Sequence, residues 1–144
     1  MKKQSYKNHV RFYPAHHFVY YPILIVFLGI SVYFTITSAE KLVWGFITAI
    51  FVYLFWLAYM LRQHYALILQ NRIIKAEFRY RYFVLTGSPF EAIEYKYTED
   101  QIFALRFASD AELLPLMQRA LVENLSGEDI KQAINHWKGD YNRV

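Results

Sequence analysis

The sequence contains two long apolar runs without a charged residue, Phe18 to Thr37 and Leu42 to Leu61. Only the four residues 38–41 separate them. An α-helix of twenty residues is about 30 Å long, which matches the hydrocarbon thickness of a bilayer. The sequence therefore predicts an all-α membrane protein built on a helical hairpin (18–61), with spans over 18–37 and 42–61.

Basic residues flank the outer ends of both predicted spans. Lys and Arg occupy positions 2, 3, 7 and 11 before the first span, and positions 62, 72, 75 and 79 after the second. Cytoplasmic flanks carry such an excess, so we expect both termini in the cytoplasm. A cleaved signal peptide is the alternative, with small residues at 37–39, but the first apolar run is too long for a signal sequence and begins only at residue 18.

The net charge of +4 is divided unevenly along the chain. Residues 1–81 carry ten Lys or Arg against two Glu, whereas residues 82–144 carry six against ten acidic residues. The absence of cysteine excludes disulfides, thiolate metal sites and cysteine nucleophiles. Outside the hairpin too few residues remain for a large enzyme domain. We therefore expect a basic part near the membrane, an acidic part beyond it, and no enzymatic activity.

Small residues suggest how the hairpin packs, because helices in lipid associate through close contacts at such positions. Gly45 and Ala49 have the spacing of a small-xxx-small motif. Counting back from the turn places Gly29 level with Ala49. We expect a Gly29–Ala49 contact, either within one chain or between two chains.

The second span is predicted to continue as a cytoplasmic stalk helix over 62–86. Neither Pro nor Gly occurs between Ala58 and Thr86, and Gly87 is a natural helix stop. Apolar residues of this helix recur at alternating spacings of three and four, which predicts the seam of a coiled coil or small bundle: Ala66, Leu69, Ile73, Ala76, Tyr80 and Phe83. A second apolar line, at Leu67, Ile74 and Phe78, widens this apolar stripe.

Two kinds of partner suit this stalk. A protein partner, meaning a second copy or a larger membrane complex, would cover the seam. Anionic lipid would instead meet the basic side chains Arg62, Arg72, Lys75 and Arg79. The protein partner is favoured because Lys75 and Arg79 line a face separate from the seam. The run of Arg and aromatic residues at 78–83 belongs to no nucleic-acid-binding module, so we expect no nucleic-acid partner.

Residues 87–144 are predicted to form a small helical tail. Four pairs have the spacing of a helix-capping box, Ser88/Glu91, Thr98/Gln101, Ser109/Glu112 and Ser126/Asp129. They predict short helices near 89–96, 99–108, 110–124 and 127–138, with Pro115 kinking or restarting the third. So small a tail is expected to lean on the stalk or on a neighbour.

Histidine is the only residue type that hints at a cofactor. His16 and His17 close the leading basic and aromatic segment (1–17), and His64 follows the second span. Antiparallel spans would bring all three to one interface, where imidazole suits haem, copper or zinc. Adjacent His16 and His17 cannot both face one ion from a regular helix, however. We expect interface anchors and no bound cofactor.

Four segments look familiar, residues 8–17 (NHVRFYPAHH), 61–67 (LRQHYAL), 105–110 (LRFASD) and 140–144 (DYNRV). Together they resemble a family of small, uncharacterised bacterial membrane proteins of the Bacteroidota type, defined by a domain of unknown function. The resemblance implies a bacterial inner-membrane location and two spans. It implies no activity and no functional residue.

Taken together, these features predict a non-catalytic inner-membrane protein. It would assemble with itself or with a larger membrane complex through its stalk seam and acidic tail, and no small-molecule substrate is indicated. The alternative is an accessory membrane protein that carries haem or a metal on its interfacial histidines, or that senses anionic lipid through its basic residues.

Overall fold

A computed structural model describes residues 4–9 and 13–140. Within those ranges all elements of regular secondary structure are helices. Two compact units divide the described chain. The first is a hairpin formed by residues 13–68. The second is a helical domain formed by residues 4–9 together with residues 69–140. The predicted all-α class is confirmed.

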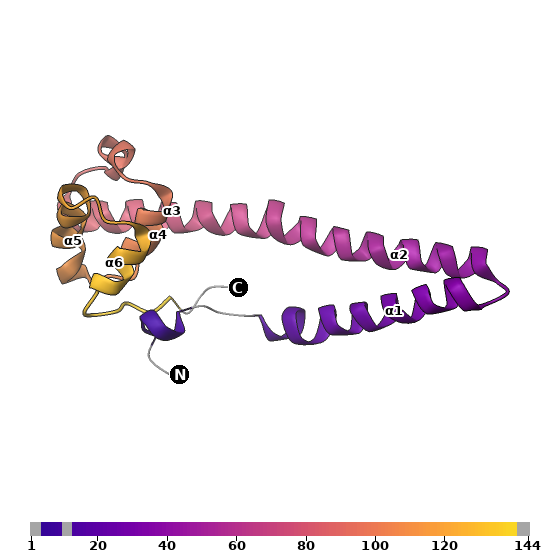
Figure 1. Ribbon diagram of the computed structural model, residues 1–144. Helices are drawn as coiled ribbons and strands as arrows, with labels where there is room; N and C mark the ends of the chain where they lie inside the picture. The colour runs from indigo at the N-terminus through magenta and orange to yellow at the C-terminus, as the bar shows by residue number, and fades with distance from the viewer. Residues whose placement is uncertain (1–3, 10–12, 141–144) are drawn as a thin grey trace. The chain divides into compact units, whose positions relative to one another are not determined.

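The hairpin consists of two antiparallel helices joined by a short turn (Figure 1). Its elements are a π-helical turn Ala15–Tyr20, α1 Tyr21–Thr37, α2 Lys41–Met60 and a second π-helical turn Leu61–Ala66. Helical backbone continues over Ala15–Thr37 and Lys41–Thr86, and both helices are long and apolar enough to cross a membrane. The predicted spans 18–37 and 42–61 fall inside them.

Hydroxyl and aromatic side chains hold α1 against α2. Ser31 is buried, and the Thr35 hydroxyl lies 3.1 Å from the Thr48 hydroxyl across the interface. The rings of Phe34 and Trp44 stack with their centroids 4.6 Å apart. Hydroxyls that bond within or between helices need no water, so this interface suits an apolar medium.

The small residues predicted to pack the hairpin lie away from this interface. Gly29 and Ala49 are exposed, and a Cβ added to Gly29 or Gly45 would meet no atom within 4 Å. Gly29 and Ala49 therefore lie on outward-facing sides of α1 and α2, and the structure does not show the expected contact between them within one chain. A contact between two chains stays a prediction.

The helical domain is built on the long helix α3, which is followed by short helices. Its elements are α3 Leu67–Thr86, 3-10 turns Phe90–Ala92 and Glu94–Lys96, α4 Glu99–Leu105, α5 Asp110–Val122 and α6 Gly127–Ala133. Gly87 ends α3 with a φ of 71°, and its N–H donates to the Phe83 carbonyl at 2.8 Å. One core joins these elements, centred on Phe78, Phe90, Ile102, Leu105, Leu113, Met117 and Ile130.

Two of the four predicted capping boxes form, at Thr98/Gln101 and at Ser126/Asp129. The Ser109 side chain makes no cap, because Glu112 instead accepts the His136 backbone N–H at 3.0 Å. Ser88/Glu91 leads only into 3-10 turns rather than a helix over 89–96. The capping box therefore fails to form where the acidic side chain contacts a residue that is distant in the sequence, as Glu112 contacts His136 and Glu91 contacts Arg79.

The later helices also differ from their predicted lengths. The last helix ends at Ala133 rather than near 138, because Ile134 is extended and Lys138 donates its N–H to the Phe107 carbonyl at 2.7 Å. That bond belongs to an isolated bridge between Ala108 and Trp137. Pro115 lies inside α5 without ending it, so the expected restart is wrong.

Residues 4–9 pack on the helical domain. The Tyr6 hydroxyl donates to the Glu128 carboxylate, and the Asp140 N–H donates to the Gln4 side-chain oxygen at 2.8 Å. The predicted leading segment 1–17 thus divides between the two units. Lys2, Lys3 and Arg11 of the predicted basic flank lie outside the described residues, as do positions 141–144.

Candidate functional site: the two faces of helix α3

One face of α3 is covered by the helical domain. Ile74 and Phe78 are buried, and the Phe78 ring meets Phe90 edge to face with centroids 4.9 Å apart. Tyr82 and Leu85 continue this covered face along the next turns and pack against the same core. Spacings of three and four residues keep all four side chains on one side of the helix. The second apolar line of the sequence, rather than its seam, is therefore what folds the domain.

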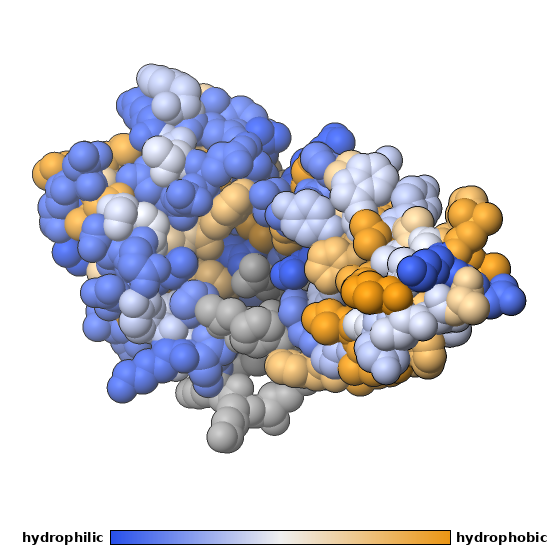
Figure 2. All heavy atoms as spheres, turned by 45° about the vertical axis from the view of Figure 1, so that its right-hand side comes forward, coloured by the Kyte–Doolittle hydropathy of each residue, from blue (hydrophilic) through white to orange (hydrophobic). Residues whose placement is uncertain are grey.

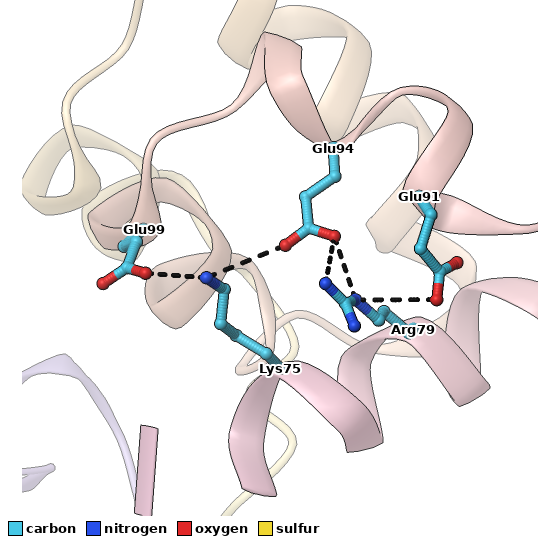
Figure 3. Close-up of polar contacts among 5 residues, drawn as sticks. All are labelled: Lys75, Arg79, Glu91, Glu94 and Glu99. Carbon is cyan, nitrogen blue, oxygen red and sulfur yellow. Dashed lines mark hydrogen bonds and ion pairs between the residues drawn. The ribbon is translucent and has the colours of Figure 1, made fainter. Parts of the chain in front are cut away.

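Lys75 and Arg79 flank the covered face and pair with acidic residues of the segment that follows α3 (Figure 3). Glu94 lies between the two cations, accepting from Arg79 Nη2 at 2.6 Å and facing Lys75 Nζ at 3.8 Å. Lys75 also donates to Glu99 at 2.6 Å, and Arg79 Nε lies 3.7 Å from Glu91. These two predicted partner-facing cations are thus engaged within the chain.

Arg81 fastens the junction between α4 and α5. Its guanidinium donates to the carbonyls of Arg106 at 3.0 Å and Ala108 at 2.6 Å, which follow the end of α4. It also donates to Asp110, the first residue of α5, at 2.6 Å. This hydrogen bond lowers the pKa of the Asp110 carboxyl below its ordinary value. One cation therefore satisfies carbonyls left over from one helix and the acid that opens the next.

The opposite face of α3 is open and carries the predicted seam. Leu69, Ile73, Tyr80 and Phe83 are 60%, 51%, 72% and 53% exposed, and Ala76 is exposed as well. These large apolar side chains are aligned over about four helical turns, and the described chain leaves them uncovered. Ala66, the sixth predicted member, lies in the π-helical turn, where the α-helical spacing does not hold. We call the five residues on α3 the open seam.

Two charged residues border the open seam. Arg72 and Glu77 are both exposed, and neither forms an ion pair with any residue in 4–9 or 13–140. Arg62, the remaining member of the predicted basic set, is exposed in the π-helical turn of the hairpin. The basic residues of the stalk thus divide into some used for folding and others left at the surface.

The three histidines do not form a metal-type cluster. The His16 ring stacks on Tyr20 with centroids 5.5 Å apart, and His17 Nδ1 lies 3.0 Å from the Tyr13 carbonyl. His64 is exposed. Across the residues that the structure describes, no group of three or more His, Asp or Glu is placed to hold an ion. The stacking of His16 on Tyr20 and the hydrogen bond of His17 to the Tyr13 carbonyl are both local contacts.

A hollow of about 440 Å³ lies beside α3 within the helical domain. Three cations and three acids contribute to its lining, so it selects neither an anion nor a cation by net charge: Arg81, Arg106, Lys138, Glu77, Asp110 and Asp140. Two of these, Arg81 and Asp110, already bond to each other. The hollow therefore offers no convergent set of groups for a particular ligand.

Sequence reasoning did not identify Arg81 and Glu94 as residues that bond α3 to the segments that follow it. A signal was present, because Lys75 and Arg79 lie four residues apart next to Ile74 and Phe78, and acidic residues follow within 25 positions. Cations beside an apolar line, with acids soon after in the chain, indicate an intramolecular face. The Arg81 bonds to backbone carbonyls left no such signal, since any residue can supply a carbonyl.

The sequence model of a protein family described as a family of unknown function (DUF6526) matches residues 1–144 of the chain. No curated protein and no solved structure matches the chain. No activity and no ligand come with these comparisons.

Proposed function

Because the chain belongs to this family of unknown function, as its quoted segments predicted, we propose its role from the geometry of α3. It is a non-catalytic integral protein of the bacterial inner membrane, and it acts as an assembly or accessory subunit. The single observation that carries the proposal is the open seam: α3 is held by the helical domain on one face and presents an ordered apolar row on the other.

The placement of apolar side chains in the hairpin supports a membrane location. No residue of α2 is buried, and α1 buries only Leu24 and Ser31. In the view of Figure 2, hydrophobic residues gather over the hairpin while hydrophilic residues cover the helical domain. An apolar surface this continuous is unfavourable in water and matches the hydrocarbon of a bilayer.

Contacts inside the helical domain support placing both termini on one side of that membrane. Residues 4–9 precede the two apolar helices, and α6 follows them, yet Tyr6 bonds to Glu128 and Gln132. Segments on opposite sides of a bilayer cannot touch, so an even number of crossings is required. The excess of Lys and Arg next to the spans then favours the cytoplasmic side.

The state of the cations favours a protein partner over anionic lipid. Lys75, Arg79 and Arg81 are tied to Glu94, Glu99 and Asp110. Binding to headgroups would require these pairs to break, which removes much of the electrostatic gain. The acidic character of residues 82–144 thus serves first to hold the basic helix.

The proposal is tested by placing Asp at both Leu69 and Ile73 and recovering the tagged protein from native membranes after crosslinking. We expect the variant to insert and fold normally but to lose its crosslinked assemblies, because charges on the open seam cannot be buried against a partner. The control is Val122→Asp, which adds one such charge at an 86% exposed position on α5. Assemblies that persist unchanged in the double variant would contradict the proposal.

A further inference from the structure

The open seam follows the heptad pattern of a two-stranded coiled coil. Labelling Ile73 and Tyr80 as positions a makes Leu69, Ala76 and Phe83 positions d. Ile73 at a and Leu69 at d match the combination that favours two strands, whereas Tyr80, Ala76 and Phe83 do not contribute to that preference. Ile74, Phe78, Tyr82 and Leu85 then take positions b, c and f, the outward positions of a coiled coil, and these are the positions that the helical domain covers. The buried contacts of the domain and the core positions of the coiled coil therefore lie on different sides of α3, while Glu77 and Tyr80 also line the hollow beside the domain.

The two charged residues that border the open seam indicate the partner and its direction. Arg72 takes position g, and Glu77 takes position e of the following heptad. In a parallel pair, g of one helix faces the following e of the other, so Arg72 faces Glu77 of a second copy on both sides of the seam. In an antiparallel pair g faces g, which brings Arg72 against Arg79. The charges thus complement a second copy only in the parallel arrangement.

We propose that α3 pairs in parallel with α3 of a second copy of this chain, through the open seam and two Arg72–Glu77 ion pairs. The inference rests on the proposed function, since it assigns the open seam to assembly and names a second copy as the partner. In a dimer with two-fold symmetry the same surface of both copies forms the interface, so that surface must be complementary to itself. A row of apolar side chains meets this requirement. The helical domain already holds α3 helical, so pairing need not nucleate a helix.

Cysteine crosslinking tests the direction of pairing, and the chain contains no cysteine of its own. Leu69→Cys and Phe83→Cys place single thiols near the two ends of the seam. In the full-length protein in membranes, we expect each variant to crosslink with itself on oxidation. An antiparallel pair would join position 69 only to position 83 in a mixture of the two variants. Val122→Cys is the control and is expected to stay monomeric.

Charge exchange tests the ion pairs. Arg72→Glu alone sets Glu against Glu, and Glu77→Arg alone sets Arg against Arg, so each is expected to lower self-association. Mixed with each other, these two variants restore both pairs. We expect the mixed pair to be recovered roughly tenfold more than either variant with itself. The double variant R72E/E77R is expected to pair with itself like the natural chain.

Failure of this inference can be told apart from failure of the proposed function. If neither cysteine variant crosslinks with itself, yet Asp at 69 and 73 still removes a different protein from the recovered assemblies, the second copy is wrong and the subunit role stands. If the assemblies survive the Asp variant and no crosslink forms, both are wrong. Equal recovery of mixed and unmixed charge variants would overturn the ion pairs and the direction they set.

Discussion

The hairpin and the helical domain are both rich in apolar residues but place them in opposite ways. Helix α2 has twenty residues and buries none, whereas α4 has seven and buries four. In α4 each buried side chain has a partner within the same chain. In α2 some side chains pack against α1, but none of them is buried by the described chain. The hydrophobicity of a residue therefore predicts only that its side chain will be covered. The spacing of apolar residues and the charges beside them help to predict whether the same chain covers it.

Helix α3 combines both kinds of surface on one element. Its covered face behaves like α4, with apolar residues bordered by cations that pair with nearby acids. Its open seam behaves like α2, with apolar residues that the chain leaves uncovered. Four experiments follow that separate buried from open positions, and they are arranged from the largest expected effect to the smallest.

The core of the helical domain should be far more sensitive to truncation than the hairpin surface. We expect Phe78→Ala to lower the free energy of unfolding of the domain by about 3–5 kcal/mol, because it empties the space against Phe90. Phe46→Ala, at a 66% exposed hairpin position, should leave the domain unchanged. Pulse proteolysis of the full chain in detergent measures both. Equal losses for the two variants would contradict the division of the chain into two units.

Glycines distinguish the two regions in the same way. A Cβ on Gly127 would lie 2.7 Å from the Asp100 carbonyl oxygen, a backbone atom that cannot move freely. We expect Gly127→Ala to destabilise the domain by about 1–3 kcal/mol, because α6 must shift away from α4. Gly29→Ala meets no atom within 4 Å and should have no such cost. Urea titration of both variants decides the matter, and an unchanged midpoint for Gly127→Ala would show that α6 adjusts easily.

The ion pairs that border the covered face should matter less than its apolar core. Glu94→Gln removes the carboxylate shared by Lys75 and Arg79, and we expect a loss of about 1 kcal/mol. Glu123→Gln removes an exposed pair with Arg119 four residues earlier and should lower the thermal midpoint less. The thermal midpoints of the two variants provide the comparison. A larger loss at Glu123 would contradict a special role for Glu94.

Acid should weaken the junction that Arg81 holds. The pKa of Asp110 is lowered in the folded protein, chiefly by the hydrogen bond from Arg81. The folded state is therefore favoured above the ordinary Asp pKa, and that contribution is lost as the pH falls through the lowered value. We expect Asp110→Asn to flatten the acid side of a plot of melting temperature against pH. Plots that coincide for both proteins would show that this carboxylate adds no pH dependence.

The helices of the chain are largely predictable from local signals, because those signals act within one turn. Thr98 and Ser126 begin helices as their capping boxes predict, and Gly87 ends α3. Predictions fail where a distant residue competes. Ser109 loses its expected partner because Glu112 binds His136, which lies 24 positions later. No property of residues 109–112 alone reveals that competition.

The residues of the candidate site could be predicted from the sequence, but spacing alone did not predict which face of α3 is covered and which is open. Spacing identifies the open seam and the second apolar line equally well, since both recur every three or four residues. In the structure the second apolar line packs on the core of the domain, and Lys75 and Arg79 beside it bond to Glu91, Glu94 and Glu99. Spacing alone does not decide between the two lines, whereas the cations beside the second line and the acids that follow it indicate which one is covered.

The packing of residues 4–9 on α6 has a consequence for the order in which the chain matures. Tyr6 leaves the ribosome before both apolar helices, while its partner Glu128 is synthesised 122 residues later. The domain can therefore be completed only after the hairpin has been made, so its earliest residues wait for its last helix. At a synthesis rate of about 5–20 residues per second, that wait lasts about 6–24 s. A tag fused ahead of residue 4 would interfere with this late closing step more than one inserted at the hairpin turn.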